Sequence, residues 1–370
     1  NTQKKNVPEL RFPEFEGEWE EKQLGNIIKV NSGKDYKHLD KGDIPVYGTG
    51  GYMTSVSEPL SEIDAVGIGR KGTINKPYLL EAPFWTVDTL FYCTPKKETD
   101  ILFILSLFRK INWKVYDEST GVPSLSKQTI NKINRFVPTN KEQQKIGKFF
   151  SKLDRQIELE EQKLELLQQQ KKGYMQKIFS QELRFKDENG NDYPDWTNER
   201  LGEVTTVTMG QSPKSVNYTD NSNDTVLIQG NADIENGLIN PRIYTREVTK
   251  LIQKDEIILT VRAPVGKLAM AQINACIGRG VCSIKGDKFL YYFLEWFATQ
   301  NKWIRFSQGS TFESISGNDI RNIHIKIPVE DERTKIIKLL NSLDVLNSKT
   351  DLKIQNLKQR KQSLLQKIFV

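Results

Sequence analysis

Two glycine-rich stretches of the sequence have residues that could bind phosphate, but each lacks a residue that this chemistry needs. GIGRKGT places Gly67 and Gly72 at the spacing of a Walker A loop, yet Thr73 stands where such a loop has its lysine. VYGTGGY, at residues 46–52, has no acidic residue at the distance that a dinucleotide-binding unit requires. The sequence therefore predicts tight loops at both places and no nucleotide site.

Signatures of DNA-modifying enzymes are also missing. No two prolines are adjacent, which excludes the Pro-Pro-aromatic sequence with which amino-methyltransferases hold the target amine. Pro194-Asp195 is not followed by the Glu-x-Lys of common nucleases. We therefore expect no catalytic residues and no cofactor bound by this chain.

Cysteine and histidine do not form a metal-binding pattern. Cys93, Cys276 and Cys282 have no CxxC spacing, and His38 and His324 are the only histidines in the chain. Such a scattered set favours neither a zinc site nor a disulfide framework. We expect all five residues to be structural and predict no metal site.

The net charge is concentrated in two segments. The 370-residue chain carries +7 in total, of which residues 141–179 supply +3 (9 basic, 6 acidic) and residues 330–370 supply +4 (9 basic, 5 acidic). A basic chain hints at nucleic acid, although a solvated helix face explains such an excess equally well.

No stretch approaches the length of a membrane span, and no basic-then-apolar signal segment opens the sequence. The expected location is the cytoplasm.

The elements that position the loops are repeated within the chain. QKIF occurs at 176–179 and again at 366–369, and the offset of 190 also matches Pro138 to Pro328 and Glu142 to Glu332. ELRF occurs at 9–12 and 182–185, in the second case directly after the first QKIF. We infer two half-units related by a pseudo-two-fold axis, in a cyclic arrangement that brings the two termini close together.

Both copies of the repeated stretch have the apolar spacing of a long coiled-coil helix of roughly forty residues. Thr139 and Glu142 have the spacing of a capping box at the start of the first helix. Lys171 and Lys361 interrupt the apolar positions in both copies, and such polar residues can fix the register. The predicted seam, or partner-docking set, comprises Ile146, Phe150, Leu153, Ile157, Leu164, Leu167, Ile178, Ile336, Leu340, Leu343, Ile354, Leu357, Leu364 and Ile368.

The remaining sequence predicts two α/β domains. Short β-rich runs such as DAVGIG, TLFYC, DTVLIQ, DEIILTV and IHIKI alternate with turns, and each domain has one apolar helix, near ILFILSLF and FLYYFLEWF. We predict an α+β fold with domains at 1–140 and 182–329. Two long antiparallel coiled-coil helices at 141–181 and 330–370 separate these domains.

The whole chain resembles the specificity (S) subunit of type I restriction-modification systems. The resemblance depends on MGQSPKSVNYTD (209–220), LIQGNADIENG (227–237), ILTVRAPVG (258–266), IGRGVCSI (277–284), GSTFESIS (309–316) and the Pro-x-x-x-Glu starts of both helices. The first half is a more divergent match, with IPVYGTGGY (44–52), IGRKGTI (68–74) and STGVPSLS (119–126).

The resemblance implies two target-recognition domains, each reading one half of a bipartite, asymmetric double-stranded DNA site. It also implies that the helices dock two methyltransferase subunits, which would carry the S-adenosylmethionine, and that restriction subunits join them. Arginines in glycine-flanked loops can reach guanine O6 and N7, whereas lysines suit phosphates. The candidate DNA-binding residues are Lys34, Tyr47, Tyr52, Arg70, Lys71, Lys127, Gln211, Ser212, Lys214, Tyr218, Asn231, Arg262, Lys267, Arg279 and Thr311.

Two other classes of protein remain as alternatives. A self-sufficient DNA enzyme would need the missing catalytic sequences, and S-adenosylmethionine binding by the isolated chain would reveal it. A coiled-coil adaptor without a nucleic-acid role would not need two divergent, loop-rich domains, and salt-dependent retention of DNA would exclude it.

Four serines align under the 190-residue offset, so we expect them to form a turn that both half-units share: Ser124, Ser126, Ser314 and Ser316.

Overall fold

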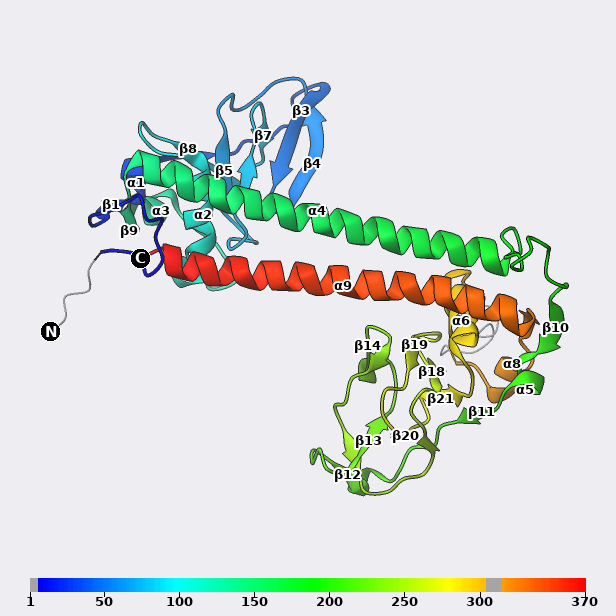
Figure 1. Cartoon of the computed structure of the whole chain (residues 1–370). Coiled ribbons are helices and arrows are strands. Elements are labelled where there is room, and N and C mark those ends of the chain that lie inside the picture. Colours follow the sequence, from blue (N-terminus) through cyan, green and yellow to red (C-terminus); the bar gives the residue numbers. More distant parts are fainter. Residues whose placement is uncertain (1–5, 304–313) are drawn as a thin grey trace. The chain divides into compact units, whose positions relative to one another are not determined.

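The computed structural model describes residues 6–303 and 314–370 (Figure 1). The chain divides into two compact units. Unit 1 comprises Asn1–Lys163 together with Thr350–Val370, and unit 2 comprises Leu164–Lys349. Each unit therefore contains one β-rich domain and a part of each of the two long helices, α4 (Asn140–Phe179) and α9 (Glu330–Ile368).

Unit 1 is built on a four-stranded and a three-stranded sheet. The four-stranded sheet has the order β2 (Ile28–Ser32), β8 (Leu90–Pro95), β5 (Ala65–Gly69) and β6 (Tyr78–Leu80). The three-stranded sheet has the order β4 (Gly51–Val56), β3 (Lys41–Gly48) and β7 (Trp85–Thr86). The other elements are β1 (Glu20–Gln23), which pairs with β9 (Asn134–Val137), and the helices α1 (Leu24–Ile27), α2 (Ile101–Lys110), η1 (Trp113–Tyr116) and α3 (Lys127–Lys132).

Unit 2 has two larger sheets. The order of the first is β11 (Val207–Met209), β21 (Val281–Ile284), β18 (Ile257–Thr260), β19 (Leu268–Met270), β15 (Leu238–Ile239) and β14 (Ile234–Glu235). The second contains β12 (Tyr218–Thr219), β16 (Tyr244–Thr245), β13 (Thr225–Ile228), β20 (Ala275–Ile277) and β17 (Leu251–Ile252). The remaining elements in the described part of unit 2 are β10 (Thr197–Arg200), which pairs with β22 (His324–Ile327), and α5 (Leu201–Val204), η2 (Ser215–Asn217), η3 (Asn231–Asp233), α6 (Lys288–Thr299) and α8 (Gly317–Arg321).

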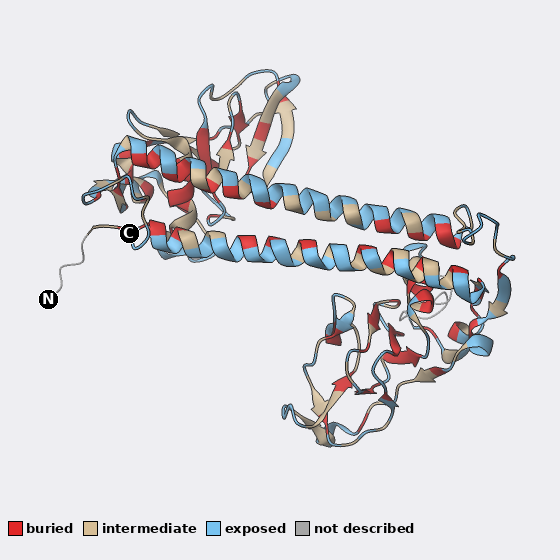
Figure 2. Cartoon of the chain, viewed as in Figure 1, coloured by how far each residue is buried: buried red, intermediate tan, exposed pale blue. Residues whose placement is uncertain are grey.

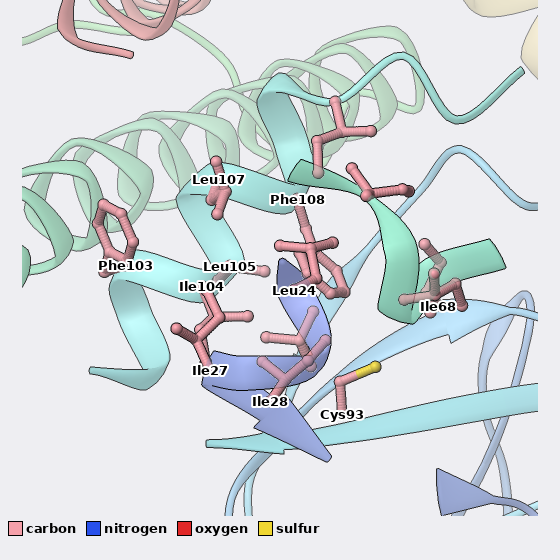
Figure 3. Close-up of a cluster of buried hydrophobic side chains, with 14 of the residues drawn as sticks. Leu24, Ile27, Ile28, Ile68, Cys93, Phe103, Ile104, Leu105, Leu107 and Phe108 are labelled. Atoms are coloured by element: carbon pink, nitrogen blue, oxygen red, sulfur yellow. The ribbon is translucent and has the colours of Figure 1, made fainter. Parts of the chain in front are cut away.

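The predicted apolar helix of each domain is part of its core. Figure 3 shows Phe103, Ile104 and Phe108 of α2 packed with Leu24 of α1 and Ile68 of β5 in unit 1. The N-cap aspartate Asp100 accepts a hydrogen bond from the backbone amide of Phe103, and Asp287 does the same for Leu290 at the start of α6. An N-cap carboxylate satisfies an amide that has no partner within the helix, so both helix starts are fixed by sequence. The α+β fold predicted from the β-rich runs and the long helices is confirmed.

The two units share one strand register, which confirms the internal duplication. In unit 1, Val66 of β5 pairs with Cys93 of β8, and Gly69 pairs with Leu90. In unit 2, Ile257 of β18 pairs with Ile284 of β21, and Thr260 pairs with Val281. Every one of these residues is shifted by 191 positions from its counterpart. Strands β18 and β21 of unit 2 therefore repeat β5 and β8 of unit 1, with a different sequence in the same pairing.

The long helices pack antiparallel within each unit. In unit 1, Asp154 of α4 forms an ion pair with Lys361 of α9. In unit 2, Lys171 of α4 forms one with Asp344 of α9, at 2.7 Å. The offset of 190 relates Asp154 to Asp344 and Lys171 to Lys361, so one pair occurs twice with the helices exchanged. The two lysines that interrupt the apolar spacing thus have defined carboxylate partners.

The predicted seam residues face the interior. Figure 2 shows buried positions recurring along α4 and α9 between exposed ones. Of the 14 predicted residues, Leu164, Leu167 and Leu364 are half-buried and the others are buried. Leu153, Ile157 and Leu357 form a cluster between the helices in unit 1, whereas Ile336 and Leu340 belong to the core of unit 2. The buried residues of the predicted set thus pack against the rest of this chain, some between the helices and some in the domain cores.

A buried glutamate near the start of each long helix ties the helix to its domain. Glu142 accepts hydrogen bonds from Arg11 Nε at 2.8 Å and from Trp19 Nε1 at 3.3 Å. Glu332 accepts from Arg184 Nε at 2.8 Å and from Trp196 Nε1 at 2.9 Å. The capping-box interpretation of Glu142 was therefore wrong, because its carboxylate binds side chains more than a hundred residues away.

The segment Leu10–Phe12 lies beside the last turn of α9, as the cyclic arrangement predicted. The backbone amide of Leu10 donates to the carbonyl of Lys367 at 2.9 Å, and Trp19 packs edge-on against Phe369. In unit 2 the amide of Leu183 donates to the carbonyl of Lys177 at 3.0 Å, in the intact connection. The same backbone hydrogen bond thus connects two segments far apart in the sequence in unit 1 and two neighbouring segments in unit 2.

Candidate nucleic-acid interface

Four predicted residues of unit 2 gather around one small surface cavity. Ser212, Asn231, Arg262 and Arg279 line a hollow of about 220 Å³, together with Gln229, Gly230, Ala263 and Gly280. Arg262 follows β18 and Arg279 follows β20, and both side chains are exposed. Two guanidinium groups and several amide and hydroxyl groups can therefore approach one ligand. Such donors suit base edges and phosphate oxygens.

Backbone contacts hold these loops in place. The amide of Gly210 donates to the carbonyl of Val281 at 3.0 Å, and the amide of Gln211 donates to the carbonyl of Ile277 at 2.9 Å. A Cβ atom on Gly210 would lie 2.1 Å from the carbonyl oxygen of Gly278, so this crossing requires glycine. The hydroxyl of Ser212 accepts from the amide of Arg279 at 3.1 Å. The loops are thus fixed without use of the arginine side chains.

A carboxylate fixes each of two neighbouring turns. Asp233 accepts hydrogen bonds from the amides of Gln229 and Gly230, two residues that line the cavity, at 2.8 and 3.1 Å. Glu247 accepts from the amide of Lys214 at 3.0 Å and from the side-chain amide of Asn217 at 2.6 Å. The bond from the Lys214 amide, followed by that from Asn217, lowers the pKa of the Glu247 carboxyl.

Two predicted lysines of unit 2 differ in what their side chains contact. The ammonium of Lys267 donates to the carbonyls of Asn231 in η3 and Ile234 in β14, at 3.2 and 2.6 Å, so it ties both elements to the residue before β19. Lys214 is exposed, and its side chain has no ion pair among the described residues. Tyr218 is half-buried, with its hydroxyl donating to the carbonyl of Pro213 at 3.3 Å. Lys214 fits a phosphate contact, whereas Lys267 has a structural role.

In unit 1 the predicted basic residues lie next to or at the ends of regular elements: Lys34 comes just after β2, Arg70 and Lys71 follow β5, and Lys127 begins α3. The amide of Lys34 donates to the carbonyl of Thr86 at 2.8 Å, and the amide of Arg70 donates to that of Thr89 at 2.8 Å. Lys71 forms a β-bridge with Ser124. Lys34, Arg70, Lys71 and Lys127 are all exposed.

The two predicted tyrosines of unit 1 form an aromatic pair on the hairpin of β3 and β4. Tyr47 and Tyr52 are strand partners, with ring centroids 6.3 Å apart in an edge-on arrangement. Tyr47 is half-buried against Tyr78, and Tyr52 is 64% exposed. The amide of Val87 donates to the carbonyl of Tyr47 at 3.0 Å, which links this hairpin to the basic loops. Tyr52 is thus the member of the pair that can meet a ligand.

The serine residues form the shared turn that the sequence predicted. Ser124 bridges to Lys71 in unit 1, and Ser314 bridges to Arg262 in unit 2. Ser126 caps α3 by accepting from the amide of Thr129, and Ser316 caps α8 in the same way. The predicted contact Thr311 lies outside the described residues.

The predicted structural role of the cysteines agrees with their burial. All three are free and buried, and burial raises the pKa of the Cys282 thiol to about 12. Such thiols are poor nucleophiles at neutral pH because the thiolate is the reactive form. Across residues 6–303 and 314–370, no group of three or more His, Cys, Asp or Glu residues could hold a metal ion. In the same residues, no helix is long and apolar enough to span a membrane.

Sequence reasoning did not single out two residues, Gln229 at the cavity and Asp88 on the loop between β7 and β8. Gln229 lines the cavity and lies in the quoted stretch LIQGNADIENG, so its motif was found but its side chain was not singled out. Asp88, an exposed acidic residue beside Thr89, carried no signal because loops of the two half-units align only after gaps are introduced. Strand register supplies that alignment.

The β-rich domain of each unit thus presents exposed cationic side chains around its loops. The sequence profile described as "Type I restriction modification DNA specificity domain" matches residues 16–169 and 193–359. The chain belongs to this family, that of the type I specificity (S) subunits.

Curated relatives and solved structures agree with this assignment. The "Putative type I restriction enzyme MjaX specificity subunit" of Methanocaldococcus jannaschii is 30% identical over 261 residues, 66% of this chain and 61% of the relative. The MjaVIII specificity subunit of the same organism is 25% identical and covers 77% of this chain and 71% of its own length. The chain thus spans less than two thirds of the first relative. The crystal structure of an S subunit from M. genitalium has the same fold, with a TM-score of 0.69 and 16% identity over 98% of this chain and 99% of that one.

Proposed function

We propose that this chain is the DNA-reading subunit of a type I restriction-modification complex. The domains at 1–140 and 182–329 each read one half of a split double-stranded DNA site, and the helices at 141–181 and 330–370 form the frame between them. Two methyltransferase subunits dock on the helices and carry S-adenosylmethionine, and restriction subunits complete the assembly. The chain itself is non-catalytic and works in the cytoplasm with its DNA.

One observation carries this proposal: each unit builds the same loop frame with different side chains at the loop ends. Gly33 and Gly210 make equivalent backbone bonds, to Leu90 and Val281, but the next residues are Lys34 and Gln211. Since side chains at base edges determine which sequence is bound, two different sets suit two unlike half-sites. The difference between the two units supports a bipartite site with two unlike halves.

The docking role of the helices is supported by their surface. Along α4 and α9 the exposed positions include Leu159, Leu166, Val345 and Leu352, each at least 45% exposed. The helices are also the basic part of the chain, with the whole net charge of +7 in their two segments. These apolar side chains lie on the outside of the helices, where a docked protein can contact them. The buried seam residues do not contribute to this surface.

The test compares two variants of unit 2. Arg262→Ala should change sequence preference at one half-site by about 1–3 kcal/mol if Arg262 is bidentate to guanine. Lys214→Ala should weaken binding to all sequences alike and lower the salt dependence of affinity, as expected for a phosphate contact. Lys254→Ala is the matched control, because Lys254 is an exposed lysine of the same unit outside the interface.

The measurement is affinity for target and scrambled duplexes at several salt concentrations, with the chain assembled with its methyltransferase subunits. Equal loss on every duplex for Arg262→Ala would reduce this residue to a phosphate contact. Absence of any salt-dependent binding to DNA would favour a coiled-coil adaptor instead. Methyl transfer by the chain alone would contradict the non-catalytic role.

A further inference from the structure

We propose that one loop position selects a base in each half-site and carries opposite charges in the two units. The position is occupied by Asp88 in unit 1 and by Arg279 in unit 2. Arg279 selects guanine, whereas Asp88 selects cytosine at the corresponding place in the other half-site. This inference rests on the proposed DNA-reading function and specifies the bases that the two loops recognise.

The equivalence of the two residues follows from hydrogen bonds on both sides of them. Immediately after Asp88, the carbonyl of Thr89 accepts from the amide of Arg70 at 2.8 Å. Immediately after Arg279, the carbonyl of Gly280 accepts from the amide of Val261 at 2.9 Å. Arg70 follows β5 and Val261 follows β18, the two strands that share a register with the 191-residue shift.

The residues before the position are equivalent as well. The amide of Val87 donates to the carbonyl of Tyr47, the last but one residue of β3, at 3.0 Å. The amide of Gly278 donates to the carbonyl of Ile228, the last residue of β13, at 2.7 Å. Strand pairing supports this match, because Trp85 pairs with Val46 and Cys276 pairs with Leu227, both in parallel. Asp88 and Arg279 therefore lie between two pairs of matching backbone bonds.

Both side chains are available to a ligand. Asp88 and Arg279 are exposed, and neither forms an ion pair in the described part of the chain. Each loop is held through its backbone: the carbonyl of Asp88 accepts from Arg70 Nη1 at 3.4 Å, and the amide of Arg279 donates to Ser212 Oγ. In unit 2 the guanidinium borders the 220 Å³ cavity that Arg262 also lines. Neither side chain is needed to maintain the fold.

The charge difference extends to the neighbouring loop. The amides of Lys34 and Gln211 make equivalent bonds, to Thr86 and Ile277, so Asp35 corresponds to Ser212 in the next position. Unit 1 thus has two carboxylates where unit 2 has a guanidinium and a hydroxyl. A carboxylate is repelled by phosphate, so an acidic loop within a DNA interface is favourable only where it accepts hydrogen bonds from a base.

Base chemistry determines the assignment. Guanine presents two acceptors, O6 and N7, in the major groove, which match the two parallel donors of an arginine. A carboxylate can only accept, and cytosine presents the N4 amino group without a neighbouring acceptor. Adenine presents its N6 amino group next to the N7 acceptor. N7 would face the second carboxylate oxygen, and two acceptors cannot form a hydrogen bond with each other. Asp88 therefore prefers cytosine to adenine. Replacing the aspartate by arginine, or the arginine by aspartate, should exchange cytosine and guanine on the contacted strand.

The experiment exchanges the residues in the full chain, assembled with its methyltransferase subunits, and sequences the methylated sites. Asp88→Arg should change cytosine to guanine on the contacted strand at one position of one half-site, with a preference of at least about tenfold. Arg279→Asp should make the opposite change in the other half-site. The half-site that is not targeted serves as an internal control in each case, and Glu58→Arg, an exposed acidic residue of unit 1, is the charge-matched control.

A second variant tests the same position without the bulk and charge of arginine, so the test still gives a result if Asp88→Arg prevents assembly of the complex. Asp88→Asn preserves the side-chain shape and can donate and accept, so it should change cytosine to adenine at the same position. An active complex that keeps the wild-type site with Asp88→Asn and Arg279→Asp overturns this inference but leaves the proposed function intact. A wild-type complex that marks no bipartite site overturns the proposed function itself.

Discussion

The buried carboxylate Glu332 gives the sharpest stability prediction. Its side chain is fully buried, and both oxygens accept from Arg184, at 2.8 Å each, while Trp196 and the amide of Phe185 donate as well. Removal of one member of a buried ion pair typically costs 3–5 kcal/mol because the other charge stays unpaired. Glu332→Gln retains one carbonyl acceptor, so we expect a loss of about 3 kcal/mol in unit 2 at pH 7.

The pH dependence of this loss has a definite sign. Burial opposes ionisation of Glu332, but the hydrogen bonds from Arg184 and Trp196 outweigh it and lower its pKa below the ordinary value of 4.5. A carboxyl group with a lowered folded-state pKa stabilises the fold above its unfolded-state pKa, and this contribution is lost as the pH falls through the folded-state pKa. The stability difference between wild type and Glu332→Gln should therefore be largest near neutral pH and shrink below pH 4.5.

Hydrogen exchange of the intact chain provides the assay, since it reports unit 2 separately from unit 1. Peptides that span the start of α9 should lose protection in Glu332→Gln, and peptides that span the start of α4 should lose it in Glu142→Gln. Glu330→Gln is the control, because Glu330 lies in the same helical turn but is 80% exposed. If Glu332→Gln is no less stable than Glu330→Gln at pH 7, the buried pair does not anchor the helix.

Two further changes test the loop frame and the helices. Gly33→Ala would place a Cβ atom 1.9 Å from the carbonyl oxygen of Val87, so we expect a loss of about 1–3 kcal/mol and altered recognition of one half-site only, whereas Gly121→Ala, with nothing within 4 Å, should change neither. These outcomes are measured by urea denaturation and by sequencing of methylated sites. A seven-residue insertion at matched positions of both α4 and α9 adds about 10.5 Å of helix and should lengthen the spacer of the methylated site by about three base pairs. An active complex that still marks the original spacer would show that the helices do not set this distance.

The long helices were predictable from sequence because their apolar residues recur at coiled-coil spacing in both copies. The observed helices have 40 and 39 residues, close to the predicted length. Lys171 and Lys361 could be recognised as interruptions of the seam, but their partners Asp344 and Asp154 follow only from the antiparallel register. The sequence shows which residues share one face of a helix. It does not show which residue of the other helix packs opposite each of them.

The candidate interface was less predictable, for two physical reasons. A side chain in a loop has no periodicity to show where it points, so Lys267 was indistinguishable from Lys214 although its ammonium binds backbone carbonyls. Loops of the two half-units also differ in length, and the offset is 177 residues at Gly33, 191 at Thr89 and 190 along the long helices. The 190-residue offset of the helices therefore aligns Asp88 with Gly278 and not with Arg279.

These features separate the residues that maintain the frame from those that meet the ligand. Gly33 and Gly210 allow the same close crossing of two strands, and Ser124 and Ser314 bridge to the same loop in their own units. None of these contacts uses the side chains of Lys71, Arg262, Asp88 or Arg279. Substitutions at the loop ends can therefore change the recognised bases without loss of the fold, because the backbone bonds that hold each loop are unaffected. The same argument explains why two copies of one domain can diverge in specificity while their strand registers remain identical.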